Sequence, residues 1–386
     1  MEGIYLDYNS TTPTAPEVAL AMAPFFTDNF ANPFNLHRFG QRARGPVNEA
    51  RESVAALLGA ASPDEIIFTG GGSESDNLAV KGVAAASVSR GRHVITSAIE
   101  HPAVLLACEW LADMGWDVTF LPPDDEGIVN ADALAAAIRP DTVLVSIMHA
   151  NNEVGTVEPI AELAAVARER GVLFHTDAVQ TAGKLPVNVN DLGVDLLSIS
   201  AHKFYGPKGV GALYVRNGVE LVPLIHGGHQ EEGRRAGTHN TPGIIGLARA
   251  LELATADREE EGKRLGRLRD RLKDGILAMP GKVVVMTPVG KAMPNTLNVC
   301  FPGIEGEAIM LALDMEGISA ATGSACASGS SEPSHVHAAM GCPPEVARGS
   351  IRFSLGKYTT EEDIGRVLKV LPPVVERLRA VSPTNE

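Results

Sequence analysis

Short apolar runs alternate with helix-like patterns over roughly the first 240 residues of the chain. Apolar runs bounded by turn residues are typical of strands that are buried on both faces. Strands that alternate with helices predict a mainly parallel sheet with helices on both sides. The predicted strands are residues 66–69, 93–96, 143–148, 172–177, 196–200 and 211–215.

The pattern changes after residues 241–243, where a long helical stretch begins. Its charged part, residues 257–273, repeats leucine at Leu265, Leu268 and Leu272, so we expect one packed face and one solvated face. Further predicted strands follow, interleaved with helices, and we expect the N-terminal segment to join them. We therefore predict a large domain of residues 15–250 and a smaller α+β domain of residues 1–14 and 251–386. The predicted strands of the smaller domain are residues 282–285, 296–301 and 351–355.

Composition narrows the class of protein. A chain of 386 residues that is 45% hydrophobic can bury a large core. A formal net charge of −14 argues against a nucleic-acid partner, and four cysteines without a paired framework suit the reducing cytoplasm. The first residues lack the basic and apolar parts of a signal peptide, and no apolar run reaches membrane-spanning length, so we expect no membrane anchor.

Candidate chemistry begins with Lys203, which follows the predicted strand 196–200, and with Asp177, which ends the predicted strand 172–177. Together they suggest pyridoxal phosphate. The lysine can hold this cofactor as a Schiff base, and the aspartate can keep the pyridine nitrogen protonated so that the ring acts as an electron sink. The alternative is that both are ordinary polar residues at strand ends.

A glycine-rich turn, residues 70–73, separates the strand 66–69 from a helical pattern at 74–83. Small residues let the backbone approach an anion, the first helical N–H groups point at it, and the Ser73 hydroxyl adds a donor. The turn lacks a Walker lysine and a following ribose-binding acid, so it favours a phosphate cradle over a dinucleotide site.

Two further polar residues follow predicted strands. His101 could stack on a pyridine ring and move protons, and Asn152 could donate to the phenolic oxygen of the cofactor or to a substrate carboxylate. Taken alone, a residue of either kind is more often a hydrogen-bonded loop residue than a ligand-binding one.

Nine short segments share one likeness: residues 5–12, 72–77, 100–104, 151–153, 175–180, 200–203, 235–238, 323–326 and 350–354. Together they resemble the cysteine desulfurases of the NifS/IscS group, which belong to the class V aminotransferases. The resemblance covers nearly the whole chain, and the runs 228–231 and 332–336 are closer to the NifS side. It implies a pyridoxal-phosphate transferase of fold type I, with a mainly parallel seven-stranded sheet in the large domain and a catalytic cysteine loop in the small one.

The resemblance also implies a role for each matching residue. Lys203 would be the Schiff-base lysine, Asp177 the pyridinium partner and His101 the ring that stacks on the cofactor. Cys326 would be the nucleophile. The other implied contacts are Gln180 with the phenolic oxygen; Gly72, Ser73, Ser200 and His202 with the phosphate; Thr238 with the phosphate of the other subunit of a homodimer; and Asn152 and Arg352 with the substrate carboxylate.

The chain departs from the common family pattern in two places. Ser73 stands where threonine is usual and follows three glycines, which predicts a looser phosphate turn. Phe34 and Asn35 replace small residues at the expected mouth of the active site.

Cys326 differs from the other three cysteines in its surroundings. Cys108 and Cys300 lie in a predicted helix and at the end of a predicted strand, and Cys342 precedes two prolines, so we expect structural or inert thiols there. Cys326 lies in a stretch of small polar residues, 322–331, that we expect to be mobile and exposed. Mobility suits a thiolate that takes sulfur from a bound substrate and carries it outwards.

The alternative role for Cys326 is that of a metal ligand, together with His335 and His337. The two histidines fall in a helical pattern and no second pair has ligand spacing, so no metal is expected.

The expected activity is that of a cysteine desulfurase. L-cysteine would become L-alanine, and its sulfur would be held as a persulfide on Cys326 and passed to an acceptor such as an iron–sulfur scaffold, for general or nitrogenase clusters. The alternatives are a selenocysteine lyase or aminotransferase of the same fold, which would not need Cys326 for ordinary turnover, and an inactive scaffold for sulfur-transfer partners.

Overall fold

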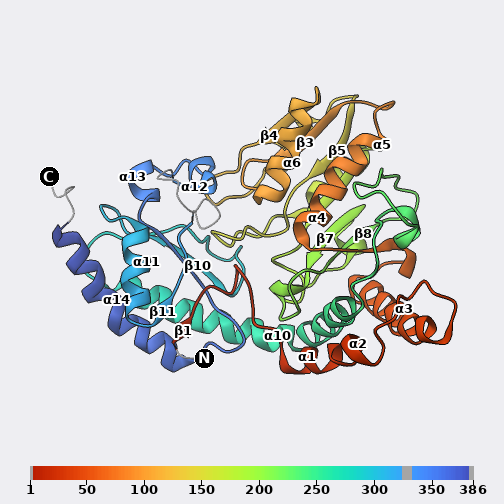
Figure 1. Ribbon diagram of the computed structural model, residues 1–386. Helices are drawn as coiled ribbons and strands as arrows, with labels where there is room; N and C mark the ends of the chain where they lie inside the picture. The colour runs from red at the N-terminus through yellow and green to blue at the C-terminus, as the bar shows by residue number, and fades with distance from the viewer. Residues whose placement is uncertain (1–2, 324–332, 382–386) are drawn as a thin grey trace.

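The computed structural model describes residues 3–323 and 333–381 and has two parts (Figure 1). The larger part, towards the right in this view, is built around a seven-stranded sheet. Up to the long helix that links the parts, the elements are β1 (Ile4–Tyr5), α1 (Pro16–Met22), α2 (Pro24–Thr27), α3 (Arg38–Leu58), η1 (Pro63–Glu65), β2 (Ile66–Thr69), α4 (Gly72–Asn77), η2 (Leu78–Gly82), α5 (Val83–Ala86), β3 (His93–Ser97), α6 (Pro102–Asp113), β4 (Asp117–Leu121), α7 (Ala131–Ala137), β5 (Thr142–Ser146), α8 (Ile160–Glu169), β6 (Leu173–Asp177), α9 (Val189–Leu192), β7 (Leu196–Ser200), η3 (Ala201–Lys203), β8 (Gly211–Val215), η4 (Gln230–Gly233) and α10 (Thr241–Leu277).

The strand order of the large sheet is β2-β8-β7-β6-β5-β3-β4. Apart from the edge strand β4, its strands are buried on both faces, because successive side chains enter different apolar clusters. Ile66 and Phe68 pack in the cluster that includes α1, α3, α8 and α10, whereas Ile67 between them packs with η2, α5 and α6. This alternation explains why the strands read as continuous apolar runs.

β8 runs opposite to the other six strands of this sheet, since it pairs antiparallel with both β7 and β2. The connection from Ser200 to Gly211 contains one short 3-10 turn and no crossover helix, so the chain returns beside β7 in the opposite direction. Lys203 lies in this connection, directly after β7. A mainly parallel seven-stranded sheet, as expected for fold type I, is confirmed.

The smaller part contains a three-stranded antiparallel sheet and a two-stranded parallel pair, β1 with β11. Its apolar cluster includes Leu6 from the N-terminal segment and Leu265, Leu268 and Leu272 from α10. The remaining elements are β9 (Val284–Val285), β10 (Thr296–Cys300), α11 (Gly306–Met315), β11 (Ile318–Ser319), α12 (His335–Ala339), α13 (Pro344–Ala347), β12 (Ser350–Ser354) and α14 (Glu361–Val381).

The N-terminal segment pairs with the smaller part, and α10 contributes to both apolar clusters (Figure 1). The predicted domain boundary at residue 250 falls inside this continuous helix. The exact limits of the two domains therefore stay a prediction.

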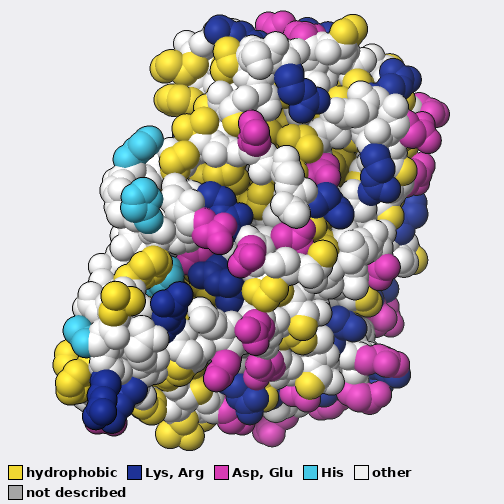
Figure 2. Space-filling model, turned by 90° about the vertical axis from the view of Figure 1, so that its right-hand side faces the viewer, with side chains coloured by type: hydrophobic (Ala, Val, Ile, Leu, Met, Phe, Trp, Pro, Cys, Tyr) yellow, Lys and Arg dark blue, Asp and Glu magenta, His cyan; other side chains and the backbone are white. Residues whose placement is uncertain are grey.

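Acidic and basic side chains are interspersed over the face shown in Figure 2, which carries no broad, purely basic surface. Among the described residues, no helix combines the length and apolar character needed to cross a membrane.

Candidate active site

A cavity of about 310 Å³ lies beyond the carboxyl ends of β2, β3, β5, β6 and β7. These five strands point the same way in the sheet, so the residues that follow them meet at one edge. Ten of the predicted site residues line the cavity: Gly72, Ser73, His101, Asn152, Asp177, Gln180, Ser200, His202, Lys203 and Arg352.

Lys203 reaches the cavity from the connection between β7 and β8. Its Nζ donates to the main-chain oxygens of Asn9, at 2.5 Å, and Ser10, at 2.8 Å. Both acceptors belong to the N-terminal segment, which crosses over the cavity from the smaller part. These two protein contacts alone therefore hold the amine beside the carboxyl ends of the strands.

Asp177 ends β6 and is 5% exposed. Its Oδ1 accepts from the main-chain N–H of Val179 at 2.8 Å, which fixes the carboxyl group within the cavity. Burial raises the pKa of Asp177 to about 6, against the opposing effects of the Val179 hydrogen bond and the charge of Lys203. A cationic ring nitrogen beside this carboxylate would replace lost hydration and favour the ionised form.

His101 caps the start of α6, where its Nδ1 accepts from the N–H of Ala103 at 3.1 Å. Burial, together with the charges of Lys203 and His335, lowers the pKa of His101 to about 4. The ring is therefore neutral at pH 7, and the bond at Nδ1 leaves the proton on Nε2. A neutral imidazole can stack on an aromatic ring and donate one hydrogen bond from Nε2.

The glycine-rich turn forms a cradle at the start of α4. A Cβ at Gly72 would come within 2.8 Å of Val179 Cγ2, and a Cβ at Gly211 within 2.7 Å of the Gly71 carbonyl carbon. Only residues without a Cβ allow the turn to lie this close to its neighbours. Next to it lies a hollow of about 440 Å³ whose lining includes Ser73, Ser200 and Lys208.

This combination of residues fits pyridoxal phosphate. The cradle offers main-chain N–H groups, hydroxyls and nearby positive charge to a phosphate, and an amine and a carboxyl group lie in the adjoining cavity. His202 borders both spaces, and its Nδ1 lies 3.1 Å from Thr11 Oγ1. Burial and the charge of Lys203 lower the pKa of His202 to about 4, so its ring is neutral at pH 7.

Arg352 extends from β12 in the smaller part towards the same cavity. Its Nη2 donates to Asp7 Oδ1 at 2.7 Å and to Ser10 Oγ at 2.9 Å, and its Nη1 donates to the main-chain oxygen of Asn152 at 2.9 Å. The buried Nε has no acceptor among the described residues. The guanidinium is thus held on one side and keeps an unused donor.

Asn9 and Asp76, which line the cavity, and Asp7, which pairs with Arg352, are among the residues that were missed at the level of sequence. The Asn9 carbonyl accepts from Lys203, and the Asn9 side chain donates to Asn152 O at 3.1 Å. Asp7 pairs with Arg352, and Asp76 is a second, fully buried acid in the lining. Burial and the charge of Asp177 raise the pKa of Asp76 well above its usual value. Asp7, Asn9 and Asp76 lie in segments that carry the family resemblance, which was the only signal that could have found them.

Two predicted site residues lie elsewhere. Thr238 is exposed in the loop after η4 and does not line this cavity. Cys326 falls outside the described residues. Within residues 3–323 and 333–381, no three His, Cys, Asp or Glu side chains gather as metal ligands would.

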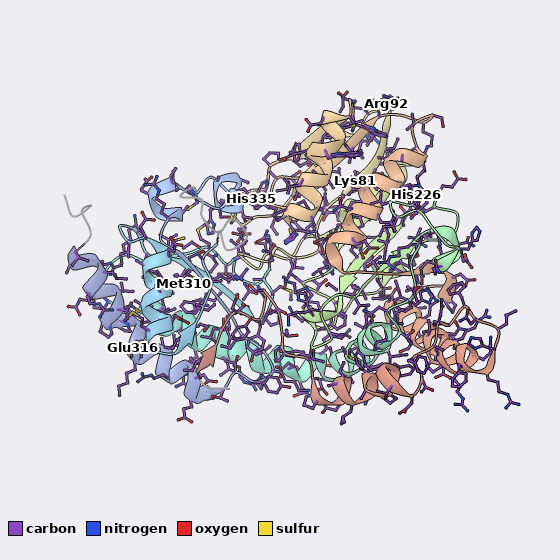
Figure 3. The ribbon with its side chains drawn as sticks, viewed as in Figure 1. Lys81, Arg92, His226, Met310, Glu316 and His335 are labelled. Carbon is purple, nitrogen blue, oxygen red and sulfur yellow. The ribbon has the colours of Figure 1, made fainter. Side chains whose placement is uncertain are left out.

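The smaller part contacts the cavity wall near the carboxyl end of β3. His335 of α12 lies between the small part and the α4 and α6 layer (Figure 3). Its Nε2 donates to the main-chain oxygen of Glu100 at 2.9 Å, directly before His101. The two parts therefore meet at the cavity.

A family model described as "Aminotransferase class-V" matches residues 4–367 of the chain. The chain is 54% identical to "Cysteine desulfurase IscS" of Dictyoglomus turgidum over 383 residues, covering 99% of this chain and 97% of that protein. It is 51% identical to the protein of the same name from Methanosarcina thermophila, covering 99% and 94% of the two chains.

Solved structures give the same picture. A structure titled "NIFS-LIKE PROTEIN" matches 97% of this chain and all of its own, with a TM-score of 0.92 and 41% identity. A structure titled "SspA in complex with cysteine" matches 92% of this chain and all of its own, with a TM-score of 0.82 and 41% identity. Relatives carry both the IscS and the NifS names, so the expected closeness to the NifS side stays a prediction.

Proposed function

The chain belongs to the class V aminotransferase family and to its cysteine desulfurases, and we propose that it uses pyridoxal phosphate and Cys326 to convert L-cysteine to L-alanine. The observation that carries this proposal is the meeting of the Lys203 amine and the buried Asp177 carboxyl group in one cavity beyond the parallel strands. One similar structure is described as a complex with cysteine, which supports L-cysteine as the substrate.

When bound, the cofactor supplies an electron sink that makes the Cα proton of an amino acid removable. Lys203 holds the cofactor covalently and, once released, takes up that proton at Nζ. Asp177 keeps a positive charge on the ring nitrogen, which favours electron withdrawal. His101 stacks on the ring and offers Nε2–H as a donor, while Gly72, Ser73, Ser200 and His202 hold the phosphate.

Arg352 holds the carboxylate of the substrate, with Asn152 beside it. The support is the unused Nε donor of a guanidinium that is 4% exposed as a side chain. Nε and one terminal nitrogen can donate side by side to the two oxygens of a carboxylate. The bonds of the two terminal nitrogens to Asp7, Ser10 and the main-chain oxygen of Asn152 keep the plane of the guanidinium fixed.

Cys326 is the sulfur acceptor in this proposal. Its thiolate attacks the sulfur of the bound substrate, so an S–S bond forms, the C–S bond breaks, and its electron pair stays with the carbon skeleton that becomes alanine. Two other cysteines are poor candidates, because burial raises the pKa of Cys108 and of Cys300 to about 12. Neither is a thiolate near neutral pH.

The partners follow from the same proposal. The exposed Thr238 reaches the cofactor phosphate of a second copy, so the active unit is a homodimer. The persulfide passes to an acceptor protein such as an iron–sulfur scaffold, for general or nitrogenase clusters. An acidic chain with few cysteines suits the reducing cytoplasm.

The test compares the purified holoenzyme with its Cys326→Ala variant, with Cys342→Ala as the matched control. We expect wild type and the control to form alanine and sulfide from L-cysteine under reductant. Cys326→Ala should keep the visible absorbance of the bound cofactor and form neither product. Equal activity of Cys326→Ala would contradict the persulfide role and favour a lyase that works without this cysteine.

A further inference from the structure

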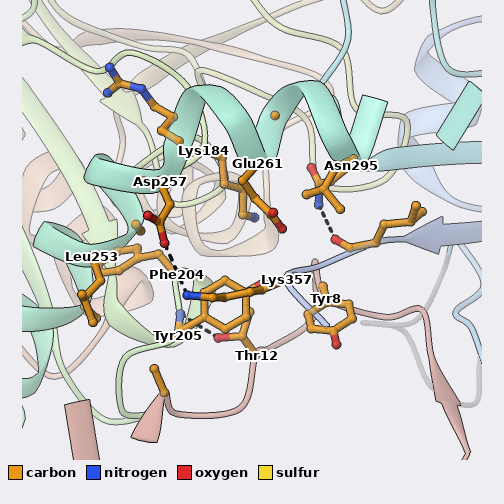
Figure 4. Close-up of a pocket in the computed structure, with 18 of the residues that line it drawn as sticks. Tyr8, Thr12, Lys184, Phe204, Tyr205, Leu253, Asp257, Glu261, Asn295 and Lys357 are labelled. Atoms are coloured by element: carbon orange, nitrogen blue, oxygen red, sulfur yellow. Dashed lines mark hydrogen bonds and ion pairs between the residues drawn. The ribbon is translucent and has the colours of Figure 1, made fainter. Parts of the chain in front are cut away.

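Lys184 is a half-buried lysine that the proposed mechanism does not use. It lies on the turn after β6, where the Lys184 N–H donates to Thr181 O at 2.9 Å. Gly183 has a φ of +73°, and a Cβ there would come within 2.7 Å of Ala254 Cβ. This close approach to α10 places Lys184 in a second hollow between the two parts, beside Glu261 and Asn295 (Figure 4).

A chain of hydrogen bonds joins Lys184 to the reactive lysine. The Lys184 Nζ donates to Gln180 Oε1 at 3.3 Å, and Gln180 Nε2 donates to Asn9 O at 3.0 Å. The same Asn9 oxygen accepts from Lys203 Nζ at 2.5 Å. Gln180 therefore lies between one lysine outside the cofactor cavity and another inside it.

The two bonds of Gln180 depend on the orientation of its amide. With Oε1 towards Lys184, the amide accepts from the amine and donates to the Asn9 carbonyl. Rotated by half a turn, the amide would set its oxygen against the Asn9 oxygen and its NH₂ against the Lys184 amine; the Asn9 bond would be lost, and so would the Lys184 bond when the amine is an ammonium. The donor at residue 184 thus selects the orientation in which the NH₂ group borders the cavity.

Burial and the charges of Lys203 and Arg352 lower the pKa of Lys184 to about 7, so both protonation states are populated near neutral pH. The ammonium and the neutral amine each carry an N–H, so either can donate to Gln180. Other ionisable groups surround this position. On the cofactor side, His202 adds a third ionisable side chain to Lys203 and Arg352. The ionisable side chains that line the second hollow are Tyr8, Tyr205, Asp257, Arg258, Glu261 and Lys357.

We propose that Lys184 is a positioning residue that acts through Gln180, by holding the amide with its Nε2–H directed to Asn9 O and the cofactor cavity. The inference rests on the proposed function, in which Gln180 lies near the phenolic oxygen of the cofactor. A donor at that oxygen stabilises its anionic form and so makes the linkage between Lys203 and the cofactor less basic. Loss of the donor makes the linkage hold its proton more tightly.

The test follows the visible absorbance of the holoenzyme as a function of pH. Lys184→Met and Lys184→Ala remove the donor, and each should raise the apparent pKa of the Lys203–cofactor linkage by roughly one unit. Lys184→Gln keeps an N–H donor without the charge, and Lys184→Arg keeps both, so these variants should titrate like wild type. In a Gln180→Ala background, Lys184→Met should add no further shift.

Two outcomes would overturn the inference. The first is an equal shift of the linkage pKa in Lys184→Gln and Lys184→Met, which would assign the effect to the charge of Lys184. The second is a shift of the linkage pKa by Lys184→Met that persists in the Gln180→Ala background. Unfolding midpoints of the holoenzymes show whether each variant is intact, and the two donor-free variants guard against a local packing failure in one of them. A wild-type protein that binds no cofactor would defeat the proposed function before any variant is compared.

Discussion

Glu158 shows how burial of a single side chain sets its charge. It is 2% exposed, its Oε2 accepts from Val129 N at 2.9 Å, and its Oε1 has no partner among the described residues. Burial raises the pKa of Glu158 to about 8. A carboxyl group with this environment is mostly neutral at pH 7.

The raised pKa makes a pH-dependent contribution to folding stability. The contribution is fully present below the unfolded pKa, about 4.3, and is lost as the pH rises through about 8. Glu158→Gln cannot ionise, so between pH 5 and 8 it should lose less stability than wild type, by about 1.4 kcal/mol for each unit of the pKa shift. Urea unfolding midpoints at both pH values measure this, and parallel pH profiles of the two proteins would refute it.

Sequence reasoning at the residue scale found the side chains that stand directly after strands. Lys203 and Asp177 could be predicted, because a charge that interrupts an apolar pattern is visible locally. Asn9 and Lys184 could not be predicted as site residues, because their roles depend on contacts that form only in the folded chain. Asn9 meets Lys203 only after the smaller part has brought the N-terminal segment over the sheet.

At the scale of elements, the start of α4 requires glycine at position 72. We expect Gly72→Ala to weaken cofactor binding by roughly tenfold, because its Cβ would lie 2.8 Å from Val179 Cγ2 and must push the turn away. Absorbance titration of the cofactor-free protein with pyridoxal phosphate measures the affinity.

The matched control is Gly266→Ala in α10, where a Cβ would meet nothing within 4 Å. This change should leave cofactor affinity unaltered and raise the free energy of unfolding by about 0.5–1 kcal/mol. Unchanged cofactor affinity of Gly72→Ala would mean that the turn can move without loss of the cradle.

Elements with strong local patterns were predicted well and edge elements were not. The strands β2, β7 and β8 have the predicted limits, since each is buried along its whole length. The edge strand β4 was missed, because most of its residues keep partial exposure and its pattern is not apolar. The helix predicted at 74–83 is interrupted by the π-helical turn η2, a change of hydrogen bonding that residue periodicity does not encode.

At the scale of the whole molecule, Asn9 joins the two parts. Its side chain donates to Asn152 O at 3.1 Å and to Thr296 Oγ1 at 2.9 Å, and it accepts from Asn295 at 3.0 Å. Its main-chain oxygen separately holds Lys203. The residue thus links the cofactor cavity to the sheet of the smaller part.

We expect Asn9→Ala to lower the free energy of unfolding by about 2–3 kcal/mol, because a buried side chain loses three hydrogen bonds, two of them to buried partners. The carbonyl contact to Lys203 remains, so the visible absorbance of the bound cofactor should persist. Asn190→Ala, which removes one exposed contact to Gly59 O, should change stability much less. Equal unfolding midpoints of the two variants would show that Asn9 does not couple the parts.

The long helix α10 bears on how the molecule comes apart. Its 37 residues span about 55 Å, and its apolar side chains enter the large cluster in the first half and the small one in the second. Loss of either core would strip packing from half of a helix whose other half remains buried. Unfolding should therefore spread from one part to the other as a single cooperative event, rather than as the separate melting of two independent domains.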